Sequence, residues 1–551
     1  MRLFLGDKVH YLPGARRVAG FLLFGLLAGC GGGGGGDDSA PVQISTNAIA
    51  FSATGPSAAV PASQTFTATF GKDVVQLAVV HSGDAIAATS SVQSGRSATI
   101  TVVPASPAAI GPGVFQGAVA VTGYTCADTT CSRMAAGSSA TLLVNYQVSP
   151  VIQSVTPYVT PSGVSDTVII RGLGFQAFSS PTVRFGDTAA TSVTINTAGT
   201  ELSATYPALA AGTYTVHLDA TNHTGEVPSN VALRVVDPVA FAATTLDHPA
   251  STTAVRRLVY DAERQALLSV TDTAPVNLIN RYQYANGAWG APTESAHGFV
   301  DAALTADGTR LLAINPTSVV PMDPVTLALG TGLDAPSLVT NSALKNIVVG
   351  YDNQALITTS LTTSGSTQGY LYDPAAGTVL LNGTSLNNAT PVMAGNGVGA
   401  VVVQGDPTLT SDVASYVYSS SSHAFSSTGT PTLRQNTVAP AVGRSFNRVV
   451  LNGTKVYDGN FSLLGTLPDT TTAVVLRSDG NRAYAYDSAA GGILVYDISV
   501  DRDEAAYTAL GAVTPLAADP GTGLQMIITP DGGTLFIGGS LRIVVQPTPA
   551  Q

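Results

Sequence analysis

The sequence predicts an all-β protein in which two β-sandwiches precede a β-propeller. Three observations predict this fold class. β-Branched residues alternate with polar residues in short runs, Gly and Pro separate these runs, and the C-terminal part repeats a strand pattern with a period near 45 residues. Hydrophobic residues make up 45% of the 551 residues and charged residues 11%, which excludes a disordered chain and supplies apolar material for about two to four cores.

Residues 1–29 have the features of an export signal. Arg16 and Arg17 precede an apolar stretch over residues 18–28, which is too short to span a bilayer. The stretch ends in Leu27-Ala28-Gly29-Cys30, a sequence that resembles the bacterial lipobox. This resemblance implies that the signal is removed, that Cys30 is lipidated, and that residues 30–40 form a Gly-rich tether.

The same resemblance predicts where the protein is located. Gly31 follows Cys30, whereas an Asp at that position commonly retains lipoproteins in the inner membrane. We therefore expect a lipoprotein of the cell envelope, anchored in the outer membrane by its acylated N-terminus. Whether the body faces the periplasm or the exterior stays open.

The charge of the chain narrows the partners that it can bind. The formal net charge is −11, and removal of residues 1–29 leaves −14. An acidic surface argues against nucleic acid as a partner and against electrostatic docking on anionic lipid. The expected lipid contact is therefore the anchor itself.

Residues 41–148 contain short alternating runs with the spacing of an immunoglobulin-like sandwich. The runs are 48–53, 64–70, 74–80, 98–103, 114–121 and 140–148. The segment loosely resembles the immunoglobulin-like repeats of bacterial surface proteins. Cys126 and Cys131 are expected to form a disulfide in an exported chain, which would stiffen one loop. The alternative is a redox or metal-binding pair.

Residues 149–237 carry a second set of strand and corner signals. Val151-Ile152 leads to Pro157, Gly172-Leu173-Gly174-Phe175 follows a β-branched run, and 212–216 alternates again. These motifs resemble the IPT/TIG family. The resemblance implies an immunoglobulin-like fold with Phe175 in its core, a spacer or interaction role, and no catalytic residues.

Residues 238–551 contain internal repeats. Seven short apolar strands are centred on residues 267, 311, 356, 401, 449, 483 and 535, at spacings between 34 and 52 residues. Four short strands per repeat at this period are typical of propeller blades. Pro530-Asp531-Gly532 and Tyr496-Asp497 are similar to motifs of YVTN propellers. We expect seven blades; the irregular spacings leave a six-bladed ring open.

The ends of the repeat region predict how the ring closes. The last repeat supplies only three strands, over residues 525–529, 534–537 and 541–545. The apolar segment Val239–Leu246 precedes the first repeat and has no partner within it. We therefore expect this segment to be the outer strand of the last blade, since an unpaired seam would expose two sheet edges.

Few residues suggest chemistry. The seven histidines are scattered, and Gly395–Ala400 matches a dinucleotide fingerprint but precedes a strand instead of a helix. Asp497, Ser499, Asp501 and Asp503 form a weak calcium candidate, with a solvated loop as the alternative. Trp289, the single Trp, is expected either to stack on sugar rings or to fill the space between blades.

The function that follows is non-enzymatic. We expect two immunoglobulin-like domains that hold a propeller away from the membrane, with the propeller binding a protein or a polysaccharide. One alternative is a lactonase-like or dehydrogenase-like enzyme with its site in the propeller channel. Such a site needs carboxylates, histidines or metal ligands that converge there, whereas small and apolar lining residues favour a scaffold. A purely structural role in the envelope is a third possibility.

Overall fold

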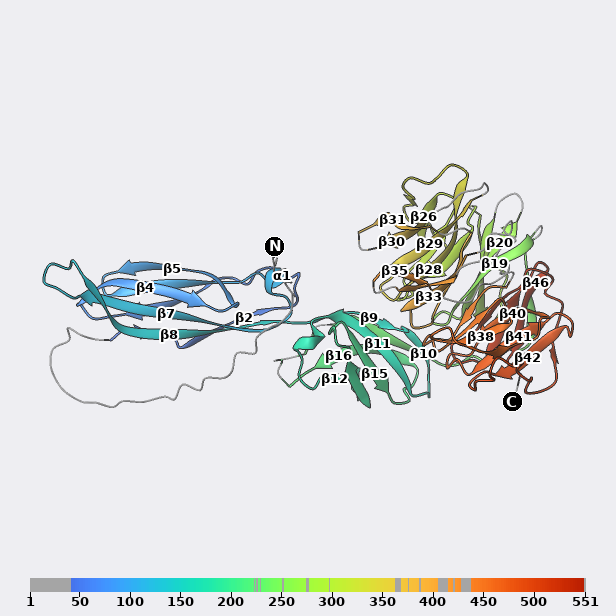
Figure 1. Cartoon of the computed structure of the whole chain (residues 1–551), viewed down its shortest axis with the longest axis horizontal. Helices are drawn as coiled ribbons and strands as arrows, with labels where there is room; N and C mark the ends of the chain where they lie inside the picture. The colour runs from blue at the N-terminus through green and yellow to red at the C-terminus, as the bar shows by residue number, and fades with distance from the viewer. Residues whose placement is uncertain are drawn as a thin grey trace, which may run out of the picture.

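The computed structural model describes residues 41–549 except 222, 224–225, 228, 250–251, 274–276, 297, 362–367, 375, 386–387, 405–414, 420–421 and 428–437. Three all-β domains follow one another along the long axis of the molecule (Figure 1). Cys30 and the expected signal and tether lie outside the described residues. Within the described residues, no helix is both long enough and apolar enough to cross a membrane.

The first domain is a sandwich of two four-stranded sheets. One sheet has the order β1 (Gln43–Ile44), β3 (Gln64–Thr69), β6 (Ser97–Pro104) and β5 (Ile86–Ser94). The other has the order β2 (Ala48–Ala53), β8 (Met134–Val148), β7 (Gly113–Cys126) and β4 (Val74–Ser82). A short helix, α1 (Pro107–Ile110), links β6 to β7.

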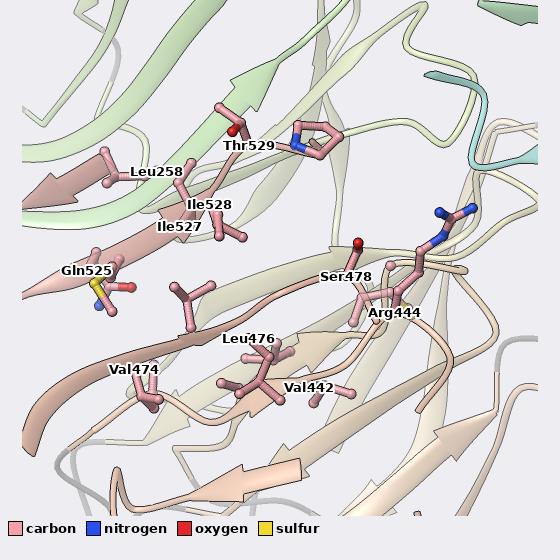
Figure 2. Close-up of a pocket in the computed structure, with 18 of the residues that line it drawn as sticks. Leu258, Val442, Arg444, Val474, Leu476, Ser478, Gln525, Ile527, Ile528 and Thr529 are labelled. Atoms are coloured by element: carbon pink, nitrogen blue, oxygen red, sulfur yellow. The ribbon is translucent and has the colours of Figure 1, made fainter. Parts of the chain in front are cut away.

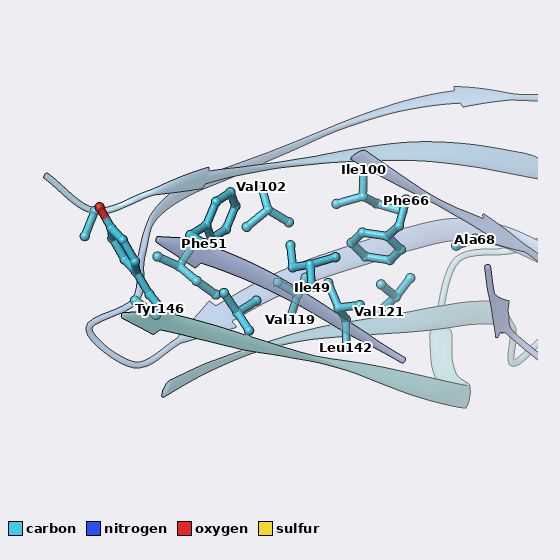
Figure 3. Close-up of a cluster of buried hydrophobic side chains, with 14 of the residues drawn as sticks. Ile49, Phe51, Phe66, Ala68, Ile100, Val102, Val119, Val121, Leu142 and Tyr146 are labelled. Atoms are coloured by element: carbon cyan, nitrogen blue, oxygen red, sulfur yellow. The ribbon is translucent and has the colours of Figure 1, made fainter. Parts of the chain in front are cut away.

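Alternation along these strands builds the core of the first domain. In β2, Ile49, Phe51 and Ala53 are buried and the residues between them are exposed. Phe51 packs edge to face on Tyr146 with ring centroids 5.9 Å apart (Figure 3). Five of the expected runs differ from the observed strands only at their ends, and 48–53 coincides with β2. The sequence reasoning missed β1 and β5.

The second domain is a sandwich of a five-stranded and a four-stranded sheet. The larger sheet has the order β10 (Val159–Pro161), β17 (Ala232–Val236), β16 (Gly212–Asp219), β12 (Thr182–Phe185) and β13 (Thr188–Ala189). The smaller has the order β14 (Ser192–Ile195), β15 (Glu201–Tyr206), β11 (Asp166–Leu173) and β9 (Val151–Thr156). Phe175 begins the 3-10 turn η1 (Phe175–Ala177) and is fully buried in the core, as predicted.

The third domain is a propeller of seven blades. The first three blades are β19–β23 (Thr252–Asp261, Ala266–Thr273, Leu278–Ala285, Ala288–Trp289, Thr293–Ala296), β24–β27 (Asp301–Leu304, Leu311–Ile314, Ser318–Met322, Leu333–Asp334) and β28–β31 (Ser342–Val349, Ala355–Leu361, Gln368–Asp373, Thr378–Ser385). The next three are β32–β35 (Thr390–Met393, Gly399–Val403, Ser415–Ser419, Ala424–Ser427), β36–β39 (Ala441–Val442, Arg448–Leu451, Lys455–Asp458, Leu463–Thr466) and β40–β43 (Thr471–Leu476, Arg482–Asp487, Gly492–Asp497, Thr514–Pro515).

The seventh blade confirms the predicted closure. It contains β44 (Gln525–Ile528), β45 (Thr534–Gly538), β46 (Arg542–Pro547) and, as its outer strand, β18 (Thr244–Asp247). Thr244 pairs with Val545 and Asp247 pairs with Arg542 in an antiparallel register. The strand therefore comes from the chain that precedes the first blade, and the seam is closed. The six-bladed alternative is wrong.

The irregular repeat spacings have a local cause. The long spacing arises because the segment between β42 and β43 leaves its own blade and bridges β39 through Thr466 and Ala506. Tyr507 anchors this segment: its ring is only 4% exposed, and its hydroxyl donates to the Val500 carbonyl at 2.9 Å. The short spacing arises where compact hairpins join β37, β38 and β39.

Candidate binding channel of the propeller

The innermost strands of all seven blades surround two neighbouring cavities of about 390 and 510 Å³. Both cavities are lined by Arg257 and Leu258 of β19, Val392 and Met393 of β32, and Ile527 of β44. Since the two share these walls, they are parts of one central channel. One end of the channel lies where the innermost strands begin, beside Gln525. The other end lies where these strands end, and there the second domain lines it.

The channel wall is mostly aliphatic. Val442, Val474, Leu476 and Ile528 line the 390 Å³ cavity (Figure 2). The polar side chains in the same wall are Thr160, Arg257, Arg444, Ser478, Gln525 and Thr529. The wall of the 390 Å³ cavity has no aromatic side chain and no His, Asp, Glu or Cys among its described residues. The converging acids or histidines that an enzyme site would need are therefore missing from this part of the wall. Small and apolar lining residues of this kind favour a scaffold over an enzyme site.

The second domain covers one end of the channel. The segment from Pro157 to Pro161, which contains the turn after β9 and strand β10, contributes to the wall of the channel. Tyr158 in this segment lies against Gly308 of the second blade, where a β-carbon would approach the tyrosine hydroxyl to 2.1 Å. Burial raises the pKa of Tyr158 above its ordinary range, and the negative charge of nearby carboxylates, Asp261 foremost, raises it further.

Polar contacts tie the second domain to several blades around this end. Arg234 of β17 pairs with Glu263 of the first blade at 3.3 Å. Arg171 stacks on the ring of Tyr351 in the third blade, with its guanidinium carbon 3.4 Å from the ring centroid. Arg444 of the fifth blade pairs with Asp166 of β11. The contacts surround the channel mouth and fix the second domain over it.

The Asp-Gly turns of the repeats lie on the same face. In the second, sixth and seventh blades they join the innermost strand to the next strand, and Gly308, Gly480 and Gly532 adopt φ angles of +67°, +73° and +75°. Only glycine takes this left-handed conformation without strain. Gly397 does the same at +67° in the turn between β32 and β33. The dinucleotide-like motif Gly395–Ala400 therefore forms the turn between two strands of a blade. This agrees with the prediction that a strand, and not a helix, follows it.

One ion pair is built into the channel wall. Arg257 of β19 donates from Nε and Nη2 to the two carboxylate oxygens of Asp301, at 2.8 and 2.6 Å. Asp301 is fully buried, whereas the side chain of Arg257 is 21% exposed and lines both cavities. Burial alone would lower the pKa of Arg257, but the charge and hydrogen bonds of Asp301 raise it above its ordinary value. The guanidinium is therefore permanently charged.

Sequence reasoning missed this pair. Arg257 lies in an innermost strand that reads as an ordinary alternating run, and Asp301 begins the next innermost strand 44 residues later. A β-bulge between Val255 and Arg257 shifts the register locally. One signal was available in the sequence: Arg257 is a charged residue in a strand of the kind that lines the channel of a propeller.

The two cysteines are joined by a disulfide in the exposed hairpin between β7 and β8. Inside this loop, Asp128 accepts hydrogen bonds from the Ser132 hydroxyl at 2.6 Å and from the Thr130 and Ser132 amides at 3.1 and 2.8 Å. The Ser132 bonds are the main cause that lowers the pKa of Asp128 to about 2. The arrangement is that of a stiffened turn. It lies in the first domain, far along the chain from the channel.

The calcium candidate is not assembled. Asp497 accepts from the Ser499 amide and hydroxyl at 3.0 and 2.5 Å, and Asp501 accepts from the Asp503 amide at 2.9 Å. Each carboxylate thus caps its own turn. Among the described residues, no three His, Cys, Asp or Glu side chains are grouped so that they could hold a metal ion. The hypothesis of a calcium site at these residues is therefore not supported.

Trp289 lies at the seam between the last and the first blade. Its ring contacts Phe241 with centroids 5.0 Å apart, Tyr284 at 5.2 Å and Phe536 at 5.7 Å. These contacts match the interpretation in which Trp289 fills the space between blades. The described histidines have separate partners and do not converge: they are His81, His217, His223, His248 and His423.

Comparison with known proteins matches one domain to a family. Residues 150–235 match the family model of the IPT/TIG domain. Comparison of the chain with curated proteins finds no match.

Two solved structures are similar to the chain. One is a hydrazine synthase from Kuenenia stuttgartiensis, at 10% identity and a TM-score of 0.42, over 55% of this chain and 98% of that one. The other is the Dos1 propeller, at 12% identity and a TM-score of 0.40, over 54% of this chain and 79% of that one. Similarity at this level carries no conclusion about activity. The second domain is thus an IPT/TIG domain, an immunoglobulin-like fold set against a propeller.

Proposed function

We propose that this protein is an envelope lipoprotein, anchored through Cys30, that binds a ligand in the central channel of its propeller without transforming it. The observation that carries the binding role is the channel cavity itself, which the innermost strands surround with mostly aliphatic side chains. Its volume of about 390 Å³ falls within the range of pockets that bury small ligands. The lipobox sequence supports the anchor.

The IPT/TIG domain has a structural part in this proposal. It covers the channel at the ends of the innermost strands through Pro157 and Pro161, and it is fixed there by Arg444 and Asp166. A ligand in the channel would therefore contact both domains. The first domain then acts as the spacer between the lipid anchor and this binding unit.

A capture experiment tests the binding role. The chain from residue 41 onward, which contains every described strand, is immobilised and exposed to an envelope extract. The double variant Met393→Trp with Ile528→Trp fills the channel, because both side chains line both cavities. This variant should not retain the material that the unaltered chain retains. Leu380→Trp is the matched control, since Leu380 is 55% exposed on an outer strand. Equal retention by all three proteins would refute a ligand site in the channel.

A further inference from the structure

Arg257 has an unused donor in the channel. Nε and Nη2 each donate a hydrogen bond to Asp301, and Nη2 also donates to the Ile347 carbonyl at 3.4 Å. Nη1 has no hydrogen-bond partner among the described residues. Since the side chain is 21% exposed and lines both cavities, its accessible part faces the channel. A ligand there meets one charged donor without a partner in a wall that is otherwise mostly aliphatic.

Asp301 is held by backbone amides as well as by Arg257. Its oxygens also accept from the amides of Ala302 and Ile347, both at 2.9 Å. Arg257 and Asp301 together are electrically neutral. Arg444, the other guanidinium in the channel wall, is likewise paired, with Asp166. A carboxylate ligand would add a buried negative charge without a free counterion, so the site fits a neutral acceptor better.

The wall determines the body of the ligand. Sugars are commonly held by stacking on aromatic rings, and the described wall of the 390 Å³ cavity has none. The 510 Å³ cavity has two, Tyr158 and Tyr260, but both rings pack on the protein itself. Tyr260 lies on Phe536 with ring centroids 5.2 Å apart, and Tyr158 lies against Gly308. An aliphatic wall fits an aliphatic chain. A cavity of roughly 150 Å³ holds benzene, so 390 Å³ has room for about a dozen carbon atoms.

We propose that the channel binds a neutral acyl chain, as in an ester, whose carbonyl oxygen accepts a hydrogen bond from Nη1 of Arg257. This inference rests on the proposed function and specifies its ligand. The aliphatic chain packs along Leu258, Met393 and Ile527, which line both cavities. The carbonyl oxygen replaces the water that Nη1 would otherwise bind.

Equilibrium dialysis with radiolabelled methyl decanoate tests the proposal. The chain from residue 41 onward should bind it saturably, and decane should bind roughly tenfold more weakly because it lacks the acceptor for a charged donor. Decanoate at pH 8 should also bind more weakly than the ester. Met393→Trp with Ile528→Trp should abolish binding, and Leu380→Trp should not.

A double variant isolates the role of Arg257. Arg257→Met with Asp301→Asn removes both charges together, so neither is left buried and unpaired. It should bind ester and decane equally, with ester affinity reduced roughly tenfold. Arg256→Met with Asp272→Asn is the matched control. It removes the ion pair between Arg256, the neighbour of Arg257 on β19, and Asp272 on β20, and neither residue lines a cavity. Circular dichroism melting verifies that each variant is folded.

The outcomes separate this inference from the proposed function. Ester and decane binding equally to the unaltered chain would overturn the role of Arg257. Absence of methyl decanoate binding would overturn the acyl ligand. If an envelope component is still captured and is lost with the channel-filling variant, the proposed function stands while the acyl inference falls.

Discussion

Leu246→Ala should weaken the whole propeller, although Leu246 belongs to a strand of only four residues. The side chain is 5% exposed and belongs to the cluster of Phe241, Tyr282 and Phe536 at the seam. Truncation of a buried Leu costs about 2–5 kcal/mol, depending on how well the site collapses. β18 is an outer strand and can move inward, so we expect a loss of about 2–3 kcal/mol in the free energy of unfolding.

The chain contains its own reporter for this experiment. Trp289 is the single Trp, and it packs at the same seam against Phe241 and Phe536. Its fluorescence during urea unfolding therefore follows the junction of the first and last blades. Tyr282→Phe removes the bond from the tyrosine hydroxyl to the Asp247 carbonyl, 3.0 Å long, and should cost about 1 kcal/mol.

The control and the refuting result are both clear. Leu380→Ala removes an equally large side chain that is 55% exposed on an outer strand, and it should change stability by less than about 0.5 kcal/mol. If Leu246→Ala unfolds at the same urea concentration as Leu380→Ala, β18 does not hold the ring closed. Deletion of residues 238–247 should have a larger effect than Leu246→Ala, with loss of solubility as well.

Four further predictions address other parts of the chain. Cys30→Ala should abolish labelling by a palmitate analogue; unchanged labelling would disprove the lipid anchor. Cys126→Ser should leave the melting temperature nearly unchanged, because its disulfide closes a short exposed loop, whereas protease cleavage of that loop should accelerate. Gly308→Ala should loosen the IPT/TIG contact, since its β-carbon would lie 2.1 Å from the Tyr158 hydroxyl at a φ of +67°; limited proteolysis between the domains measures this. Burial lowers the pKa of Lys345 to about 8, so the cost of burying the charged amine is full below that pH and disappears above the ordinary value of 10.5. Lys345→Met removes this cost together with the hydrogen bond from Nζ to the Asn388 carbonyl, 2.6 Å long, so the change in melting temperature on substitution should be more favourable at pH 7 than at pH 11.

In the first domain, alternation is what made strands predictable. Every second residue of β2 and β6 is buried and the residues between are exposed or half-buried, and the pattern is visible in their letters. β5 was missed because it is an edge strand whose residues after Ile86 are mostly exposed Ala, Thr, Ser and Gln. Nothing in that composition separates a solvated edge strand from a loop. Its identity comes from pairing with β6, which is a long-range contact.

The candidate site was less predictable than the fold. Repeat spacing indicated a ring, and a ring implies a channel, so the location followed from the sequence. The chemistry did not, because the wall combines single residues from strands about 45 positions apart. Arg257 and Asp301 acquire meaning only when neighbouring blades bring them within 2.8 Å. The contact of the IPT/TIG domain with the channel was also hidden, since Pro157 and Arg444 belong to different domains.

The order of the domains determines which end of the channel a ligand can reach. Val42 is bonded to the Ser138 hydroxyl at 2.7 Å, near the hairpin end of β8, whereas Val148 at the other end of β8 leads into the IPT/TIG domain. The described chain therefore enters the first domain at the end away from the IPT/TIG domain, and the intervening length of β8 is roughly 33 Å at the rise of a β-strand. The IPT/TIG domain then covers the mouth of the channel where the innermost strands end. If the channel binds a ligand as proposed, we expect the ligand to enter at the opposite mouth, where the innermost strands begin.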